Sequence, residues 1–192
     1  MKITKFLGIA GLLSPLMGFT TIIVTVFIHE WFSWKNNALS DLGALTTSYS
    51  SIYNIGMILT GLLGILFVAG LFFFFKSKIS LLGSILFFVG MIFLVLVGVF
   101  PSGTSPHLEV SLGFFASSSA GILLIGIGES LRRNMTGYAA LITVIVGIPS
   151  AFWAVENYSG AAIPETVGAI CFSVITIFYG TKMFREGNGE RE

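Results

Sequence analysis

Six long apolar stretches constrain the fold of this chain more than any other feature of its sequence. A transmembrane α-helix needs about 20 apolar residues to cross the hydrocarbon core of a bilayer. Stretches of about this length cover residues 6–28, 52–75, 79–100, 110–130, 136–155 and 164–182. Because lipid offers the backbone no hydrogen bonds, each stretch is expected to be a helix. We therefore predict an all-α, polytopic membrane protein, a six-transmembrane-helix bundle in which residues 1–192 form a single transmembrane domain.

The composition of the chain also indicates a membrane protein. Hydrophobic residues make up 55% and charged residues 10% of the 192 residues, whereas soluble domains carry roughly 25% charged residues. The net charge of +1 provides no basic face for a phosphate backbone, which excludes nucleic acid as a partner bound through charge. The single cysteine, Cys171, excludes an intrachain disulfide and is expected to be a small core residue.

Lysine and arginine positions predict the orientation of the helices. With six helices, every Lys and Arg except Lys35 falls on one side of the membrane. Short loops rich in these residues stay in the cytoplasm, so both termini are expected there, in a multi-pass protein of the cell (plasma) membrane. The first apolar stretch is longer than the core of a signal peptide and ends without a small-residue cleavage pattern, so we interpret it as a membrane helix.

Both histidines and most acidic residues fall on the opposite, outer side. Asp and Glu contribute little to topology, so orientation does not explain this concentration. The outer group consists of His29, Glu30, Asp41, His107, Glu109, Glu156 and Glu165. The inner acids lie near basic residues and are interpreted as solvated or headgroup-level charges; they are Glu129, Glu186, Glu190 and Glu192.

Residues 36–44 form the polar centre of the longest connection between apolar stretches. Leucines recur around this centre with a helical spacing, at Leu39, Leu42 and Leu45. We expect this long loop between the first two helices to hug the membrane and fold back onto the bundle. Two interpretations of Asp41 stay open: it caps a short helix, or it belongs to a polar site together with Asn37 and Ser40.

Other outer residues are predicted to lie in or near first helical turns. Asn54 lies about one turn inside the second apolar stretch, where it either hydrogen-bonds to a neighbouring helix or forms part of the wall of a site. Pro106 suits the first position of a helix. His107 and Glu109 then lie in a first turn with free N–H groups, where His107 is available as a ligand or base. Glu165 follows another proline in the same way and favours a helix start.

Several of these residues together resemble a known family. The pattern Asn-x-Leu-Ser-Asp-Leu-Gly ends at Gly43, Asn54 and Gly56 open the second stretch, Phe100 and Pro101 precede His107, and Glu165 opens the sixth. This combination resembles the six-span prokaryotic membrane family catalogued as domain of unknown function nine-nine-eight, over nearly the whole chain. That family commonly has Glu-Arg where this chain has Glu165-Thr166, so the ion pair of the family is not implied here. The resemblance implies a six-helix fold and no activity, and the suggested distant relatives of the family are six-span proteins linked to lipid handling and autophagy.

Three classes of function are compatible with an outward-facing polar site. The first is binding or movement of a lipid, a cation or a small amphiphile, with membrane lipid as the partner. Six helices are few for a transporter, so this class is compatible with a homo-oligomer. The second is a membrane-embedded hydrolase, metal-dependent or acid–base, that acts on a lipid-linked substrate. The third is a structural or regulatory membrane protein whose polar loops only dock.

Candidate site residues come from the outer group and its neighbours. The candidate catalytic residues are Asp41, His107 and Glu165. The candidate ligand-binding residues are Asn37, Ser40, Asp41, Asn54, His107, Glu109, Glu156 and Glu165. A catalytic zinc ion takes three protein ligands and a water, and the candidate ligands are His29, His107, Asp41 and Glu165. Because the sequence contains no His-x-x-x-His or His-Glu-x-x-His pattern, a zinc site depends on these separated residues alone.

Overall fold

The computed structural model describes residues 3–187 and consists of six long α-helices and one short 3-10 helix. The elements are α1 (Ile3–Ile28), η1 (Leu39–Gly43), α2 (Ser50–Phe74), α3 (Lys78–Val99), α4 (His107–Ser130), α5 (Met135–Asn157) and α6 (Ala162–Gly187). All six α-helices are long and apolar enough to cross a membrane, and residues 3–187 contain no strand. The predicted all-α, six-helix architecture is confirmed. Helices α4 and α6 extend past the predicted apolar stretches because helical geometry continues into their polar end turns.

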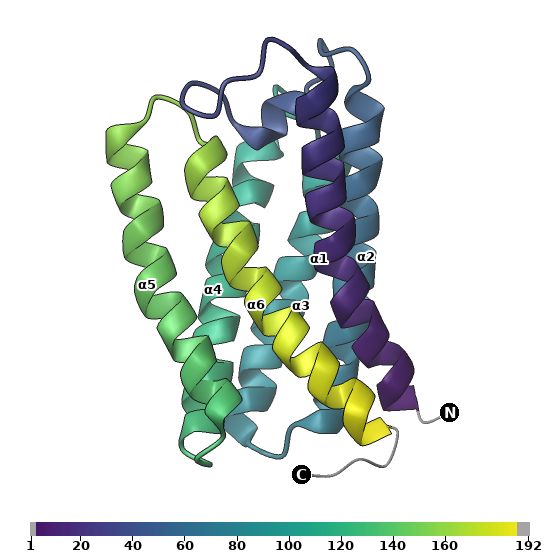
Figure 1. The fold of residues 1–192 in the computed structure, drawn as a ribbon, viewed down its shortest axis with the longest axis vertical. Helices are drawn as coiled ribbons and strands as arrows, with labels where there is room; N and C mark the ends of the chain where they lie inside the picture. The colour runs from purple at the N-terminus through teal and green to yellow at the C-terminus, as the bar shows by residue number, and fades with distance from the viewer. Residues whose placement is uncertain (1–2, 188–192) are drawn as a thin grey trace.

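The six helices form a closed ring. Helices that follow each other in the sequence pack side by side, and α1 also packs against α6 (Figure 1). The start of α1 and the end of α6 lie at one end of the bundle, and η1 lies at the other (Figure 1). We call these the terminal end and the loop end. The cytoplasmic location of the terminal end stays a prediction.

Small residues close this ring at the contact between α1 and α6. A Cβ atom on Gly8 would lie 2.7 Å from the carbonyl oxygen of Gly180, so the two backbones touch at this crossing. Close approach of this kind is how helices associate in lipid, where van der Waals packing rather than the hydrophobic effect holds them together.

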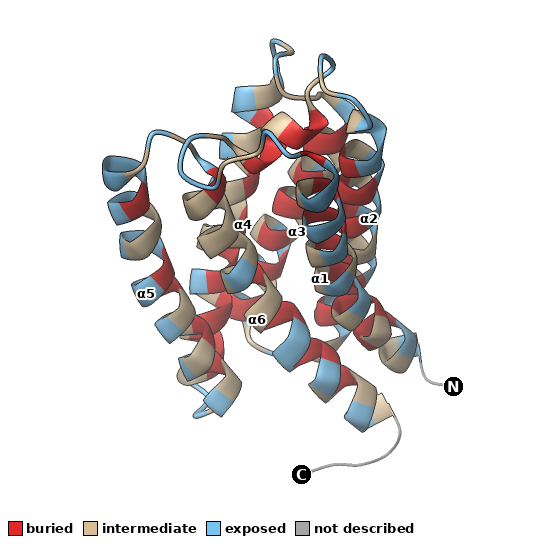
Figure 2. Cartoon of the chain, turned by 45° about the horizontal axis from the view of Figure 1, so that its top comes forward, coloured by how far each residue is buried: buried red, intermediate tan, exposed pale blue. Residues whose placement is uncertain are grey.

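Large apolar side chains cover the outside of the bundle. Phe27 is 82% exposed, Phe152 68% and Ile145 66%, all on the lateral surface of membrane-length helices. Exposed residues line the outer faces of the helices, and buried residues face the middle of the ring (Figure 2). An apolar surface of this extent suits acyl chains, because water would disfavour it.

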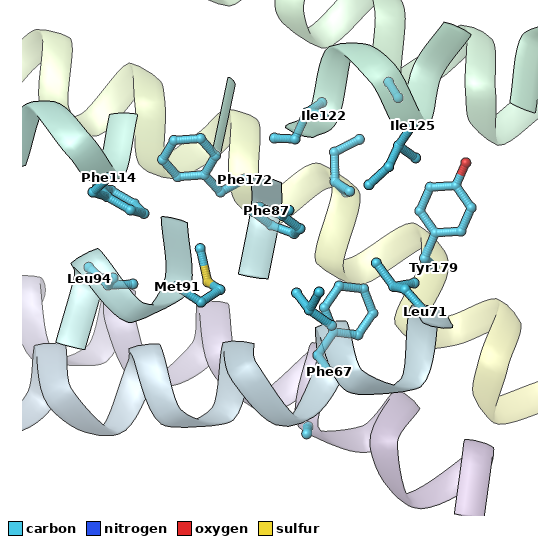
Figure 3. Close-up of a cluster of buried hydrophobic side chains, with 14 of the residues drawn as sticks. Phe67, Leu71, Phe87, Met91, Leu94, Phe114, Ile122, Ile125, Phe172 and Tyr179 are labelled. Atoms are coloured by element: carbon cyan, nitrogen blue, oxygen red, sulfur yellow. The ribbon is translucent and has the colours of Figure 1, made fainter. Parts of the chain in front are cut away.

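A dense aromatic and aliphatic cluster fills the terminal half of the ring. The side chains of Phe67, Leu71, Ile125 and Tyr179 are fully buried and come from α2, α4 and α6 (Figure 3). The ring of Tyr179 packs edge-on against Phe75 with centroids 5.1 Å apart. This cluster fills the middle of the bundle in its terminal half and separates the space inside the loop half of the ring from the terminal end.

Glu129 differs from the prediction for the inner acids. Its side chain is only 4% exposed, and its two oxygens accept hydrogen bonds from Ser80 Oγ (2.8 Å) and Asn134 Nδ2 (3.0 Å). The interpretation of Glu129 as a solvated charge is therefore wrong. The carboxylate joins α3, α4 and the start of α5, a role that no local pattern around residue 129 indicates.

Replacing Glu129 by alanine is expected to destabilise the bundle. Ser80 and Asn134 would lose their acceptor, and an unsatisfied buried polar group costs about 1–3 kcal/mol. Thermal unfolding of the detergent-solubilised protein measures the effect. Glu186→Ala is the matched control, because Glu186 is an exposed acid at the same end of the bundle. Equal melting temperatures for the two variants would contradict the structural role of Glu129.

Candidate functional site

The connection between α1 and α2 folds back onto the loop end of the bundle. Leu39 and Leu42 of η1 are 3% and 0% exposed, whereas Leu45 is 71% exposed. His29 ties both ends of this connection together, because its Nδ1 lies 2.6 Å from Thr25 O and its Nε2 lies 2.6 Å from Ser48 O. The prediction of a loop docked on the bundle is thus confirmed, with Leu45 outside the buried face.

The first turn of α6 and the residues just before it hold this loop through hydrogen bonds. Gly160 N donates to Lys35 O and Ala162 N donates to Asn37 O, each at 2.9 Å. Leu39 N donates to Glu165 Oε2 at 2.5 Å, and the Ser40 N–H also hydrogen-bonds to this carboxylate. Glu165 is therefore more than a favourable charge at a helix start, since it binds η1 across the end of the ring.

The capping interpretation of Asp41 is confirmed, whereas its role in a ligand site stays a prediction. Its Oδ2 accepts a hydrogen bond from Ala38 N at 2.9 Å, which caps η1. Its Oδ1 accepts from Ser102 Oγ at 3.4 Å, which links η1 to the loop between α3 and α4. Asp41 also lies close enough to Glu165 and Tyr53 for electrostatic interaction.

Asn54 fixes the end of η1. Its Nδ2 donates to Gly43 O at 2.8 Å, and a Cβ atom at Gly43 would collide with the Asn54 side chain. Asn54 was expected either to hydrogen-bond to a neighbouring helix or to form part of the wall of a site. In the structure its amide hydrogen-bonds to the docked loop and not to a neighbouring long helix. Asn37 accepts a hydrogen bond from Ser33 N through its side chain and stabilises the same loop.

The remaining predicted site residues lie outside this group. His107 Nδ1 lies 2.7 Å from Phe100 O, and its Nε2 lies 3.4 Å from Ser111 Oγ, so the ring braces the start of α4. Glu109 and Glu156 are exposed. Within residues 3–187, no three His, Cys, Asp or Glu side chains are grouped as metal ligands. The structure brings Asp41 and Glu165 together and leaves His29 and His107 bound to backbone carbonyls.

A cavity of about 100 Å³ lies under η1 in the middle of the ring. Ser40, Tyr53, Ser111 and Glu165 line its loop end, and its walls are otherwise largely aromatic and aliphatic. The aromatic wall residues are Phe19, Phe87, Phe114, Phe115 and Phe172 (Phe87, Phe114 and Phe172 are labelled in Figure 3). We call this space the central cavity.

A larger cleft of about 490 Å³ lies beside it, between α4, α5 and α6. Leu112, Ile148 and Phe152 on its rim are exposed on the lateral surface, so the cleft faces the lipid. Helix α5 forms its outer wall at the edge of the bundle (Figure 1). We call this space the lateral cleft. The central cavity and the lateral cleft share four lining residues, namely Ser111, Phe115, Glu165 and Phe172.

Sequence reasoning missed Tyr53 and the aromatic walls. The Tyr53 side chain is 5% exposed and lines the central cavity. A tyrosine near the start of a membrane helix ordinarily indicates an interfacial aromatic residue. No signal in the sequence distinguishes an interfacial tyrosine from one that points into the middle of the bundle. Only the packing of α2 against η1 decides where the Tyr53 side chain points.

Replacing Glu165 by alanine is expected to release η1 from α6. Hydrogen bonds to charged groups contribute about 1.5–3 kcal/mol, so the open state of the loop should be populated about tenfold more. Lys35 is the only tryptic site in residues 29–49, so cleavage after Lys35 reports this opening. Glu165→Gln keeps an acceptor and should stay close to the native rate. Exposed Glu156→Ala is the control, and an unchanged rate in Glu165→Ala would contradict the docking role.

Comparison with known proteins gives a family and no closer relative. No curated protein and no solved structure matches the chain. The family described as "Protein of unknown function (DUF998)" matches residues 9–182, which include η1, all of α2 to α5 and most of α1 and α6. The match agrees with the predicted resemblance and with the six apolar helices of the structure. The chain therefore belongs to the DUF998 family of membrane proteins of unknown function.

Proposed function

We propose that this protein binds a lipid or a small amphiphile from the surrounding membrane in the lateral cleft, with the polar end of the ligand at Glu165. The observation that supports this most directly is the position of Glu165 in the walls of both the lateral cleft and the central cavity. A carboxylate at the inner end of a lipid-facing apolar cleft matches the two chemically different parts of an amphiphile.

The size and lining of the lateral cleft suit the apolar part of such a ligand. Its volume of about 490 Å³ is within the usual range of ligand sites, roughly 300–1,000 Å³. Its lining is apolar apart from a few small polar side chains and Glu165. A groove between transmembrane helices also holds ordinary bilayer lipids, so specific binding depends on what the polar end meets.

The polar end meets a group that the chain holds in place. Glu165 is fixed by the hydrogen bond from Leu39 N, and Leu39 and Ser40 of η1 line the central cavity beside it. A ligand that reaches Glu165 from the cleft therefore meets a positioned carboxylate instead of bulk water. The filled terminal half of the ring favours binding over passage through the bundle, because Phe67, Leu71 and Tyr179 occupy that path.

The contacts give less support to a membrane-embedded hydrolase or to a purely structural or regulatory membrane protein. The histidines proposed for hydrolysis bind backbone carbonyls at 2.6–2.7 Å. Capping by Asp41 fits a docked structural loop, but docking alone does not account for a lipid-facing cleft that reaches Glu165.

Filling the lateral cleft is expected to reduce ligand binding. Ala151 lines the cleft on α5, and Ala151→Phe would place a ring in the space proposed for the acyl chain. A photoactivatable single-chain lipid, incorporated into nanodiscs with the protein, should label peptides of α4, α5 and α6 in the native protein. In Ala151→Phe this labelling should fall several-fold.

Ile145→Phe is the matched control for this experiment. Ile145 lies on α5, is 66% exposed and does not line the cleft, so the same ring there should leave labelling unchanged. Equal labelling of native protein and Ala151→Phe would contradict the proposed site.

A further inference from the structure

We infer that the polar end of the ligand is a cationic ammonium group, held in the central cavity by the carboxylate of Glu165, the hydroxyl of Tyr53 and the surrounding aromatic rings. This inference rests on the proposed amphiphile site and assigns the chemical class of the headgroup. The acidic residues, the hydroxyl of Tyr53, the aromatic walls and the size of the cavity each contribute to it.

The ionisable residues at the central cavity that carry carboxyl groups are Glu165 and its neighbour Asp41. Glu165 lines the cavity, and Asp41 lies close enough to interact with it electrostatically. The hydrogen bonds to these carboxylates in the described chain come from N–H groups of Leu39, Ser40 and Ala38 and from one hydroxyl, all of them neutral donors. Neutral donors orient a carboxylate without cancelling its charge, so the site still favours a cation.

The chain supplies little positive charge at this end. Lys35 is the only Lys or Arg between α1 and α2, and its side chain is exposed on the loop. A phosphate monoester would therefore bring a further negative charge into a poorly solvated space beside two acidic residues. Like charges repel strongly in such a space, so an anionic headgroup is disfavoured more than a neutral one.

Tyr53 provides the second, independent observation. Its side chain is 5% exposed and lines the central cavity. Its hydroxyl lies close enough to Glu165 and Asp41 to interact with both electrostatically. A phenolic hydroxyl can donate and accept a hydrogen bond, so Tyr53 offers a ligand a polar contact beside the carboxylate.

Aromatic rings form the rest of the wall. Phe114 and Phe172 pack edge-on with centroids 4.8 Å apart, and Phe115 lies 4.9 Å from Phe114. These three rings and Glu165 line the same cavity. A carboxylate beside several aromatic faces is the arrangement that recognises ammonium and quaternary ammonium groups, because the ring faces attract cations.

The cavity size selects a headgroup rather than a chain. An apolar cavity of roughly 150 Å³ accepts a benzene molecule, so the central cavity, at about 100 Å³, holds a smaller group. An ammonium or trimethylammonium group fits this limit, and the larger lateral cleft takes the chain. The shared wall at Glu165 and Phe115 is where the two parts would join.

Competition between matched amphiphiles tests the inference. Dodecyltrimethylammonium, dodecyl phosphate and dodecyl maltoside share one chain and carry a cationic, an anionic and a neutral headgroup. Each is titrated against photolabelling of the native protein in nanodiscs. The ammonium compound is expected to compete at a concentration about tenfold lower than the maltoside, since 1.4 kcal/mol of headgroup interaction corresponds to tenfold. The phosphate compound should be the weakest competitor.

Variants locate the preference. Glu165→Gln keeps an acceptor for Leu39 N and removes the charge, so it should reduce the preference for ammonium to about twofold or less while maltoside competition stays unchanged. Tyr53→Phe should weaken the preference less, because it removes only the hydroxyl. Glu109→Gln is the charge-matched control at the same end of the bundle, on an exposed residue, and should keep the full preference.

The outcomes separate this inference from the proposed function. Equal competition by all three amphiphiles in the native protein would overturn the cationic headgroup and leave the cleft intact. A full ammonium preference in both Glu165→Gln and Tyr53→Phe, with native melting temperatures, would overturn the assignment to the central cavity. Failure of the proposed function itself would appear earlier, as unchanged labelling in Ala151→Phe.

Discussion

The hydrogen bond between the Leu39 N–H and the Glu165 carboxylate is the interaction on which the loop end of this structure depends. It joins residues 126 positions apart and holds η1 over the open end of the helix ring. A carboxylate in such a place is costly unless donors surround it. The backbone N–H groups of Leu39 and Ser40 stabilise Glu165 there.

Two spaces of different character meet at this residue. The lateral cleft faces lipid and is large and apolar, whereas the central cavity is small, aromatic and covered by η1. The cluster around Phe67 and Tyr179 closes the ring towards the terminal end. An amphiphile bound here would therefore be held at one face of the membrane, with its headgroup inside the protein and its chain at the protein–lipid boundary.

The sequence predicted the helices well because membrane spanning is a strong constraint on composition. The length of the apolar stretches predicted all six helices, and the spacing of the leucines predicted the docking of residues 36–44. Leu45 was predicted to share the docked face but is exposed, because the docked turn ends before it. Long-range pairing was not predictable: the partners of Glu129, Glu165 and Asn54 depend on how helices pack, which local patterns do not encode. Grouping the histidines with the acids assumed that polar residues at one end share one site, and backbone carbonyls instead bind both rings.

An experimental structure of the protein in nanodiscs of natural membrane lipid would test the central claim most directly. The account predicts continuous density that enters the lateral cleft between α4 and α5 and ends within hydrogen-bond distance of Glu165 and Tyr53, with η1 docked above it. Lipid density confined to the outer surface of the helices, with the cleft closed by α5 or a headgroup turned away from Glu165 towards the membrane surface, would contradict it.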